Sequence, residues 1–209
     1  MSSAAEFVEN LHITPEDGSI GTSGASYRDW GFTIYRTAYG PASEQRWQSL
    51  LVTIQSQTRE CALKHFEVDQ DDPDFAHLWS LFRLDARSDK AKFDGLDIDQ
   101  VRESYNGIDE TQPMNKFDSL RRVFLVADEE VLSEANATVV KAASAGYTPV
   151  VYDATWDSRG CRQRYFGWMK MTTGSVLDLW RDLENQDFEN IAPPTIGESH
   201  LVIWDGVYY

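Results

Sequence analysis

The stretch that decides the fold is RYFGWMKMTTGSVLDLWRDL, residues 164–183, because it contains the clearest strand, turn and helix pattern in the chain. Residues 165–171 are mostly aromatic or apolar, which predicts a strand covered on both faces. The helix that follows has apolar residues at the i, i+3, i+4, i+7 spacing of one face: Val176, Leu179, Trp180 and Leu183.

Ser175 is the predicted N-cap of this helix, with Asp178 three residues later completing a capping box. A helix with a single apolar stripe has to bury that stripe against another element. We therefore expect the helix to lie on the sheet that contains the preceding strand.

The other elements are assigned from two patterns: alternation of apolar and polar residues for strands, and apolar residues at i, i+3, i+4, i+7 for helices. The predicted strands are residues 30–39, 77–84, 121–127, 147–156 and 201–204. The predicted helices are residues 43–65, 96–105 and 128–146, the last starting at Asp128 as N-cap and ending at Gly146. Residues 67–74 read as an acidic loop.

The element order predicts an α+β fold with a largely antiparallel sheet and helices on one face. From residue 121 onward the order is β-α-β-β-α-β, so the C-terminal half is predicted to be ferredoxin-like. Residues 1–26 lack periodicity and are predicted to be a flexible N-terminal arm, and residues 27–209 a single domain. Three glycines in the arm have no strand before them and no helix after them, so they do not indicate a nucleotide-binding loop.

The net charge of −15 disfavours nucleic acid and anionic membranes as partners, because both are bound through clustered Lys and Arg. The first ten residues lack a secretory signal, and no run approaches the ~18 apolar residues of a membrane span. The two cysteines, Cys61 and Cys161, are too few for a disulfide scaffold. We expect a soluble cytoplasmic protein whose partner is a small molecule or another protein, and a homodimer is compatible with the sequence.

Three short blocks carry a resemblance to a known group of proteins. They are Trp30-Gly31-Phe32 with Ile34-Tyr35-Arg36, then Asp128-Glu129-Glu130 after an apolar strand, then Gly167-Trp168-Met169-Lys170. Together they span most of the chain between Trp30 and Lys170, and they resemble uncharacterised intracellular proteins of filamentous fungi. The resemblance implies an intracellular location and assigns no catalytic residue.

Arg36 and Lys170 each occur on an otherwise apolar strand face, where a charge has to be paired. Each is either part of an ion pair or a pocket residue that holds a ligand carboxylate. If the protein is an enzyme, the candidates for orienting, proton transfer and stacking are Arg36, Tyr35, Asp153, Trp168 and Lys170.

Arg159, Arg162 and Arg164 surround Cys161 in a chain that is otherwise acidic. These guanidiniums are candidate ligands for an anionic group, and they favour the thiolate of Cys161. The alternative is a structural network in which Asp153 and Asp157 neutralise the arginines.

No pattern indicates a metal or a cofactor, because the histidines lack metal-ligand spacing and no phosphate-binding loop is present. The sequence is compatible with two functions. The first is an intracellular binding or interaction protein. The second is a cofactor-independent lyase, isomerase or cyclase that acts on a hydrophobic molecule in a pocket between sheet and helices.

Overall fold

The five strands found among the described residues form one sheet in the order β2-β1-β3-β4-β5. The computed structural model describes residues 3–13, 27–107, 111–133, 137–148, 165–194 and 202–207. The strands are β1 (Trp30–Arg36), β2 (Phe82–Arg87), β3 (Val123–Ala127), β4 (Val139–Ser144) and β5 (Trp168–Thr172). The helices are α1 (Ala4–Asn10), α2 (Ser43–Phe66), α3 (Pro73–Ser80), α4 (Lys90–Phe93), α5 (Ile98–Asn106), α6 (Glu129–Ser133), the 3-10 turn η2 (Thr173–Ser175), α8 (Val176–Asp182) and α9 (Phe188–Ile191).

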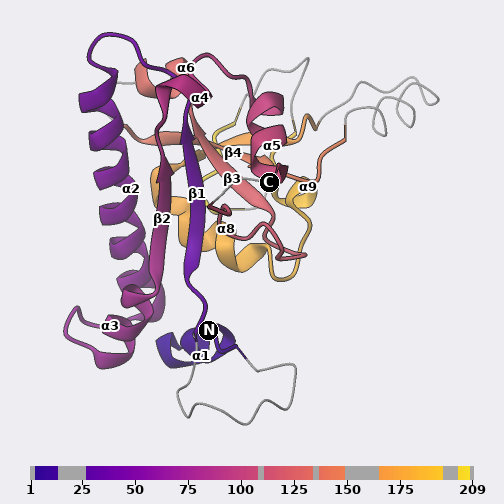
Figure 1. The fold of residues 1–209 in the computed structure, drawn as a ribbon. Helices are drawn as coiled ribbons and strands as arrows, with labels where there is room; N and C mark the ends of the chain where they lie inside the picture. Colours follow the sequence, from indigo (N-terminus) through magenta and orange to yellow (C-terminus); the bar gives the residue numbers. More distant parts are fainter. Residues whose placement is uncertain are drawn as a thin grey trace.

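The sheet is mixed, and the α+β class predicted from the sequence is confirmed. β1 is parallel to both of its neighbours, β2 and β3. β3, β4 and β5 form an antiparallel meander in chain order. β1 lies inside the sheet and all seven of its residues are buried (Figure 1).

Helices cover both faces of the sheet, which corrects the prediction that they lie on one face. α2 and α8 bury Trp47, Leu50 and Trp180 in the larger hydrophobic core, whereas Phe93 of α4 and Tyr105 of α5 belong to the core on the opposite face. The chain passes from β1 to β2 through α2, then back past β1 to β3 through α4 and α5. Right-handed crossovers that run in opposite directions place their helices on opposite faces.

The predictions for β1, α2 and α5 are confirmed within a few residues at their ends. The buried residues of α2 include Trp47, Leu50 and Ile54, which recur at helical spacing. Cys61 of the same helix is half-buried, and burial raises the pKa of its thiol. Within the described part of the chain, no helix is long and apolar enough to cross a membrane.

The strand predicted at residues 77–84 is wrong, because this part of the chain begins as a helix. The side chain of Asp72 accepts a hydrogen bond from the amide of Phe75 at 2.9 Å, and Pro73 occupies the first turn of α3. An aspartate N-cap followed by proline is a strong start signal for a helix. The strand β2 begins only at Phe82.

The helix predicted at residues 128–146 is also wrong in its second half. Asp128 does cap a helix, since its Oδ1 accepts from the amide of Val131 at 3.1 Å, but α6 ends at Ser133. Val139–Ser144 is instead the strand β4, paired with β3 on one side and β5 on the other. The consecutive β-branched residues at the start of β4 favour a strand over a helix.

The unit at residues 165–183 has the predicted order of strand, turn and helix, with two differences. β5 is covered on one face only, because Met169 and Met171 are buried whereas Trp168 and Lys170 are half-exposed. The apolar stripe of α8 is fully buried, as predicted: Val176, Leu179, Trp180 and Leu183.

The predicted capping box at the start of α8 is wrong. Ser175 makes no cap hydrogen bond with its side chain, and its hydroxyl lies 2.6 Å from that of Thr172. The 3-10 turn η2 precedes α8 directly and places Ser175 in a conformation outside the extended region that a capping residue adopts.

Part of the predicted N-terminal arm is a docked helix. Ser3 and Glu6 form a capping box at the start of α1, and Phe7, Val8 and Leu11 are buried against the main core. Residues 14–26 lie outside the described residues.

The ferredoxin-like order is not confirmed. β3, β4 and β5 are sequential neighbours, whereas a split β-α-β unit needs a crossover between parallel strands. Most of the strand predicted at 147–156 lies outside the described residues. In the strand predicted at 201–204, Trp204 makes a single parallel bridge with Met171 of β5.

Candidate ligand-binding groove at the carboxyl ends of β1 and β3

The parallel strands β1 and β3 lie side by side and end at the same edge of the sheet. Arg36 pairs with Ala127 in the register, and the amide of Thr37 donates to the carbonyl of Ala127 at 3.0 Å. From this edge the chain leaves β1 toward β2 on one side and leaves β3 toward β4 on the other. Where neighbouring connections diverge at the carboxyl ends of parallel strands, a crevice is left that commonly binds ligands.

A groove of about 570 Å³ occupies this position. Its walls come from three segments that are far apart in the sequence: residues within 37–46 after β1, residues 94–97 after α4, and residues within 128–133 after β3. Ligand pockets for small molecules have volumes of ~300–1,000 Å³, so the groove is large enough for one. Figure 1 shows α4 and α6 together at this end of the sheet and α3 at the other end.

The groove is lined by more negative than positive side chains. The lining carboxylates are Asp94, Asp97, Asp128, Glu129 and Glu130, and the lining cation is Arg46. Arg46 donates to the carbonyl of Leu132 at 3.1 Å, so part of its hydrogen-bonding capacity is used within the protein. The excess of carboxylates favours a cationic ligand group over an anionic one.

Two of these carboxylates have structural roles as helix caps. Asp97 accepts from the amide of Gln100 at 2.9 Å at the start of α5, and Asp128 caps α6. Asp94 lies 3.9 Å from the ammonium of Lys90, a distance at which exposed charges interact weakly. Glu129 is exposed on the first turn of α6.

Lys141 and Lys170 lie behind one wall of the groove, as direct register partners on β4 and β5. The buried ammonium of Lys141 lies 2.5 Å from Asp128 and 2.7 Å from Glu130, and Lys170 forms an ion pair with Glu130. Lys141 also lies 5.0 Å from the centre of the Trp168 ring, a cation–π distance.

These contacts determine the protonation states of Glu130 and Lys141. Hydrogen bonds from Lys141 and Lys170 lower the pKa of Glu130 to about 2. Burial lowers the pKa of Lys141, but its hydrogen bonds to Asp128 and Glu130 outweigh burial, so that the pKa is raised overall. Both groups are therefore charged throughout the physiological pH range.

Arg36 is buried below the groove and is fully engaged by the protein. Its side chain is 4 % exposed and forms an ion pair with Glu44. It also donates to the carbonyl of Ala38 at 3.0 Å and to the hydroxyl of Ser43 at 2.8 Å, and its guanidinium lies 4.4 Å from the centre of the Tyr39 ring. The arginine thus ties the loop after β1 to the start of α2.

Tyr35 lies on the other face of the sheet from Arg36, since adjacent residues of a strand point in opposite directions. Its ring packs edge-on against Phe93 and Phe124 in the smaller core, at centroid distances of 5.3 and 5.9 Å. The two neighbouring candidates therefore do not act at one site.

The structure brings together Trp168 and Lys170 among the residues proposed from the sequence. Asp153, Arg159, Cys161, Arg162 and Arg164 lie outside the described residues. Sequence reasoning missed Lys141, which fell in a segment predicted to be helical. It predicted Asp128 as a helix cap but placed neither Asp128 nor Glu130 at a site. Acidic residues directly after a buried strand were the available signal for this edge of the sheet.

The interface between sheet and helices beside β1 is filled by aromatic side chains. The Trp180 ring lies edge-on to Phe32 and Trp30 at centroid distances of 5.7 and 6.4 Å. In the described ranges, no group of three or more His, Cys, Asp or Glu side chains is placed to hold a metal ion.

Comparisons with known proteins add no relative: no family model, no curated protein and no solved structure was found to match the chain.

Proposed function

We propose that the protein is a cytoplasmic binding protein that takes up a small molecule with a cationic group in the groove at the carboxyl ends of β1 and β3. The observation that carries the proposal is the position of this groove of about 570 Å³, at the edge where the connections of two parallel strands diverge. The cytoplasmic location rests on the sequence alone, through its two cysteines, which are too few for a disulfide scaffold.

The charge of the lining supports a cation as the recognised group. A ligand ammonium ~4 Å from one exposed carboxylate gains ~1 kcal/mol in water and more where the groove excludes water. Glu129 and Asp94 are exposed, and the ion pair of Asp94 with Lys90 is long at 3.9 Å, so both carboxylates can turn toward a ligand. The Arg46 guanidinium opposes this attraction but is already bonded to Leu132.

Binding is better supported than catalysis. A general base works best when its pKa is near the operating pH, and Glu130, with a pKa of about 2, is a weak base. Arg36 and Lys170, the two cations proposed as catalytic, form ion pairs with Glu44 and Glu130. The enzyme alternative also needs a pocket between sheet and helices, whereas the groove lies at the edge of the sheet.

The test compares ligands that carry opposite charges on the same phenylethyl group. Isothermal titration calorimetry is performed with 2-phenylethylamine and with 3-phenylpropionate, and agmatine serves as a second, more polar cation. We expect saturable binding of at least one amine and none of the carboxylate. Glu129→Gln is expected to weaken amine binding about fivefold, which corresponds to ~1 kcal/mol.

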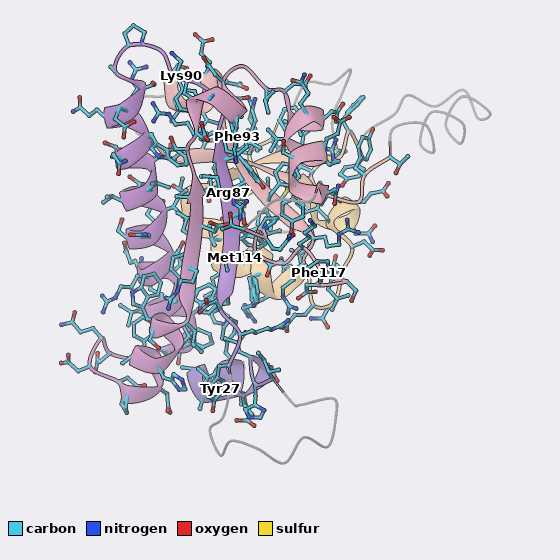
Figure 2. The ribbon with its side chains drawn as sticks, viewed as in Figure 1. Tyr27, Arg87, Lys90, Phe93, Met114 and Phe117 are labelled. Carbon is cyan, nitrogen blue, oxygen red and sulfur yellow. The ribbon has the colours of Figure 1, made fainter. Side chains whose placement is uncertain are left out.

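Asp71→Asn is the matched control, because it removes one exposed carboxylate near α3, at the opposite end of the sheet. Figure 2 shows the same two ends, marked by Lys90 of α4 and by Tyr27. This control should leave binding unchanged. Equal binding of amine and carboxylate, or an equal loss in both variants, would contradict the proposed groove.

A further inference from the structure

The C-terminal segment, residues 202–207, lies along the outer edge of β5. The amide of Thr172 donates to the carbonyl of Trp204 at 2.8 Å, and the amide of Trp204 donates to the carbonyl of Lys170 at 2.9 Å. The Trp204 side chain is completely buried in the main core. Its flanking residues Ile203 and Val207 are exposed, whereas the indole and the two backbone hydrogen bonds attach the segment to the core and to β5.

The attachment is weakened by a polar atom without a partner. The indole nitrogen of Trp204 is buried and donates no hydrogen bond to the described residues. A buried donor left unpaired reduces the stability gained from burying the ring. The segment is therefore held less firmly than a strand in the middle of the sheet.

Gly206 lies directly over the carboxyl group of Asp178 on α8. A methyl group placed on Gly206 would be 2.7 Å from Oδ2 of Asp178, and Gly206 has a φ of +91°, which other residues rarely adopt. The segment thus passes over this carboxyl at a distance that only glycine permits. Closing the segment removes water from the carboxyl group.

The charged groups around Asp178 come from three elements. On α8, Asp182 repels a negative charge at Asp178 and Arg181 attracts it. On α2, Cys61 is close enough for its thiol to be affected by Asp178, with Lys64 and Glu60 of opposite charge beside it. On the segment itself, Asp205 precedes Gly206 and adds a further carboxyl.

We propose that residues 202–207 form an acid-tightened latch, which closes over Asp178 when this carboxyl is protonated and loosens when it is ionised. The direction follows from linkage. Burial, followed by the repulsion from Asp182, raises the pKa of Asp178 above its ordinary value. The repulsion from Asp182 on the same helix does not depend on the latch, so the part of the burial that Gly206 contributes is what couples closure to protonation. The closed latch is therefore favoured at low pH, and it loses stability as the pH rises through the raised pKa.

When the latch opens, the edge of β5 becomes exposed. The carbonyl of Lys170 and the amide of Thr172 lose their partners, and the site of the Trp204 ring is vacated. The latch thus controls access to this edge in response to pH.

Hydrogen exchange of the full-length protein tests the latch. The protection of the Thr172 and Trp204 amides is measured at about pH 3.5, below the ordinary pKa of an aspartate, and at about pH 8, with correction for the intrinsic exchange rate. We expect protection to fall about tenfold for each unit by which closure raises the pKa of Asp178. In Asp178→Asn, protection should be high and equal at the two pH values.

Two further variants are measured in the same way, one as a matched control and one that disrupts the contact with Asp178. Asp187→Asn makes the same chemical change at the start of α9, outside the contact with Gly206, and should retain the pH dependence of the wild type. Gly206→Ala should lower protection of both amides at either pH, because its methyl group collides with Asp178. The latch is refuted if the wild type shows no pH dependence, or if Asp178→Asn shows the same dependence as the wild type.

Discussion

Trp180 should be one of the largest single contributors to stability. Its side chain is completely buried on α8, edge-on to Phe32 and Trp30. An indole buries ~150–250 Å², which at ~25 cal/mol per Å² corresponds to ~4–6 kcal/mol. Trp180→Ala keeps the β-carbon and allows partial collapse of the cavity, so we expect a loss of ~3–5 kcal/mol in the free energy of unfolding.

The contact with Arg121 adds to this loss. The guanidinium of Arg121 lies 4.6 Å from the centre of the Trp180 ring, and its Nε donates to the Trp180 carbonyl at 3.3 Å. Truncation removes the cation–π contact but leaves the backbone hydrogen bond. The expected cost is therefore at the upper end of the range, measured by urea denaturation monitored by circular dichroism.

The Trp180→Phe variant separates the contribution of the aromatic ring from that of the indole nitrogen. The indole nitrogen of Trp180 is buried and has no hydrogen-bond partner among the described residues, so phenylalanine gives up no hydrogen bond seen there and keeps an aromatic ring in the core. We expect a loss of only ~1–2 kcal/mol. A loss below ~1 kcal/mol for Trp180→Ala would show that the stripe of α8 does not face the core, and equal losses for the two variants would show that the indole nitrogen is hydrogen-bonded.

Two other variants probe the sheet and the charge cluster. Gly31→Ala should lower the free energy of unfolding by ~3 kcal/mol or more, because its methyl group would lie 2.0 Å from the Arg83 carbonyl oxygen and φ is +121°; thermal melts showing a change below ~1 kcal/mol would contradict the close approach of β1 and β2. Glu130→Gln should lower stability at neutral pH. Because the folded-state pKa of Glu130 is depressed to about 2, the difference from wild type should be complete above pH ~4.5 and vanish as the pH falls through about 2; a pH-independent difference in urea melts would refute the ion pairs.

Long periodic segments were predictable from the sequence, and short ones were not. α2 extends over 24 residues, and its apolar stripe repeats often enough to define a helix. α3 has only 8 residues, and its helical start signal, Asp72 before Pro73, was outweighed by an alternation in the following residues that continues into β2. The Val139–Ser144 strand was mistaken for a helix because its apolar residues fit both periods over so short a length.

The groove could not be predicted, because nothing in the local sequence links its walls. Asp94 and Glu129 become neighbours of Tyr39 only when β1 and β3 pair in parallel. The strand β3 and the cap Asp128 were each predicted correctly, but an adjacent parallel pair cannot be inferred from them separately. The face of the sheet that each helix covers also depends on the direction of its crossover. Element order alone does not give this direction.

The burial of β1 between β2 and β3 has a consequence for the order of folding. The end of β1 at Arg36 and the start of β3 at Val123 are separated by 87 residues, the difference of the two positions. At ~5–20 residues per second, a ribosome needs roughly 4–17 s to make this stretch. The fully buried β1 emerges long before its second neighbour exists, whereas the meander of β3, β4 and β5 pairs strands that follow one another along the chain. Contacts between nearby segments form faster than those that close long loops. The last-synthesised part of the sheet is therefore expected to assemble first and to serve as the template on which the first-synthesised strand is finally buried.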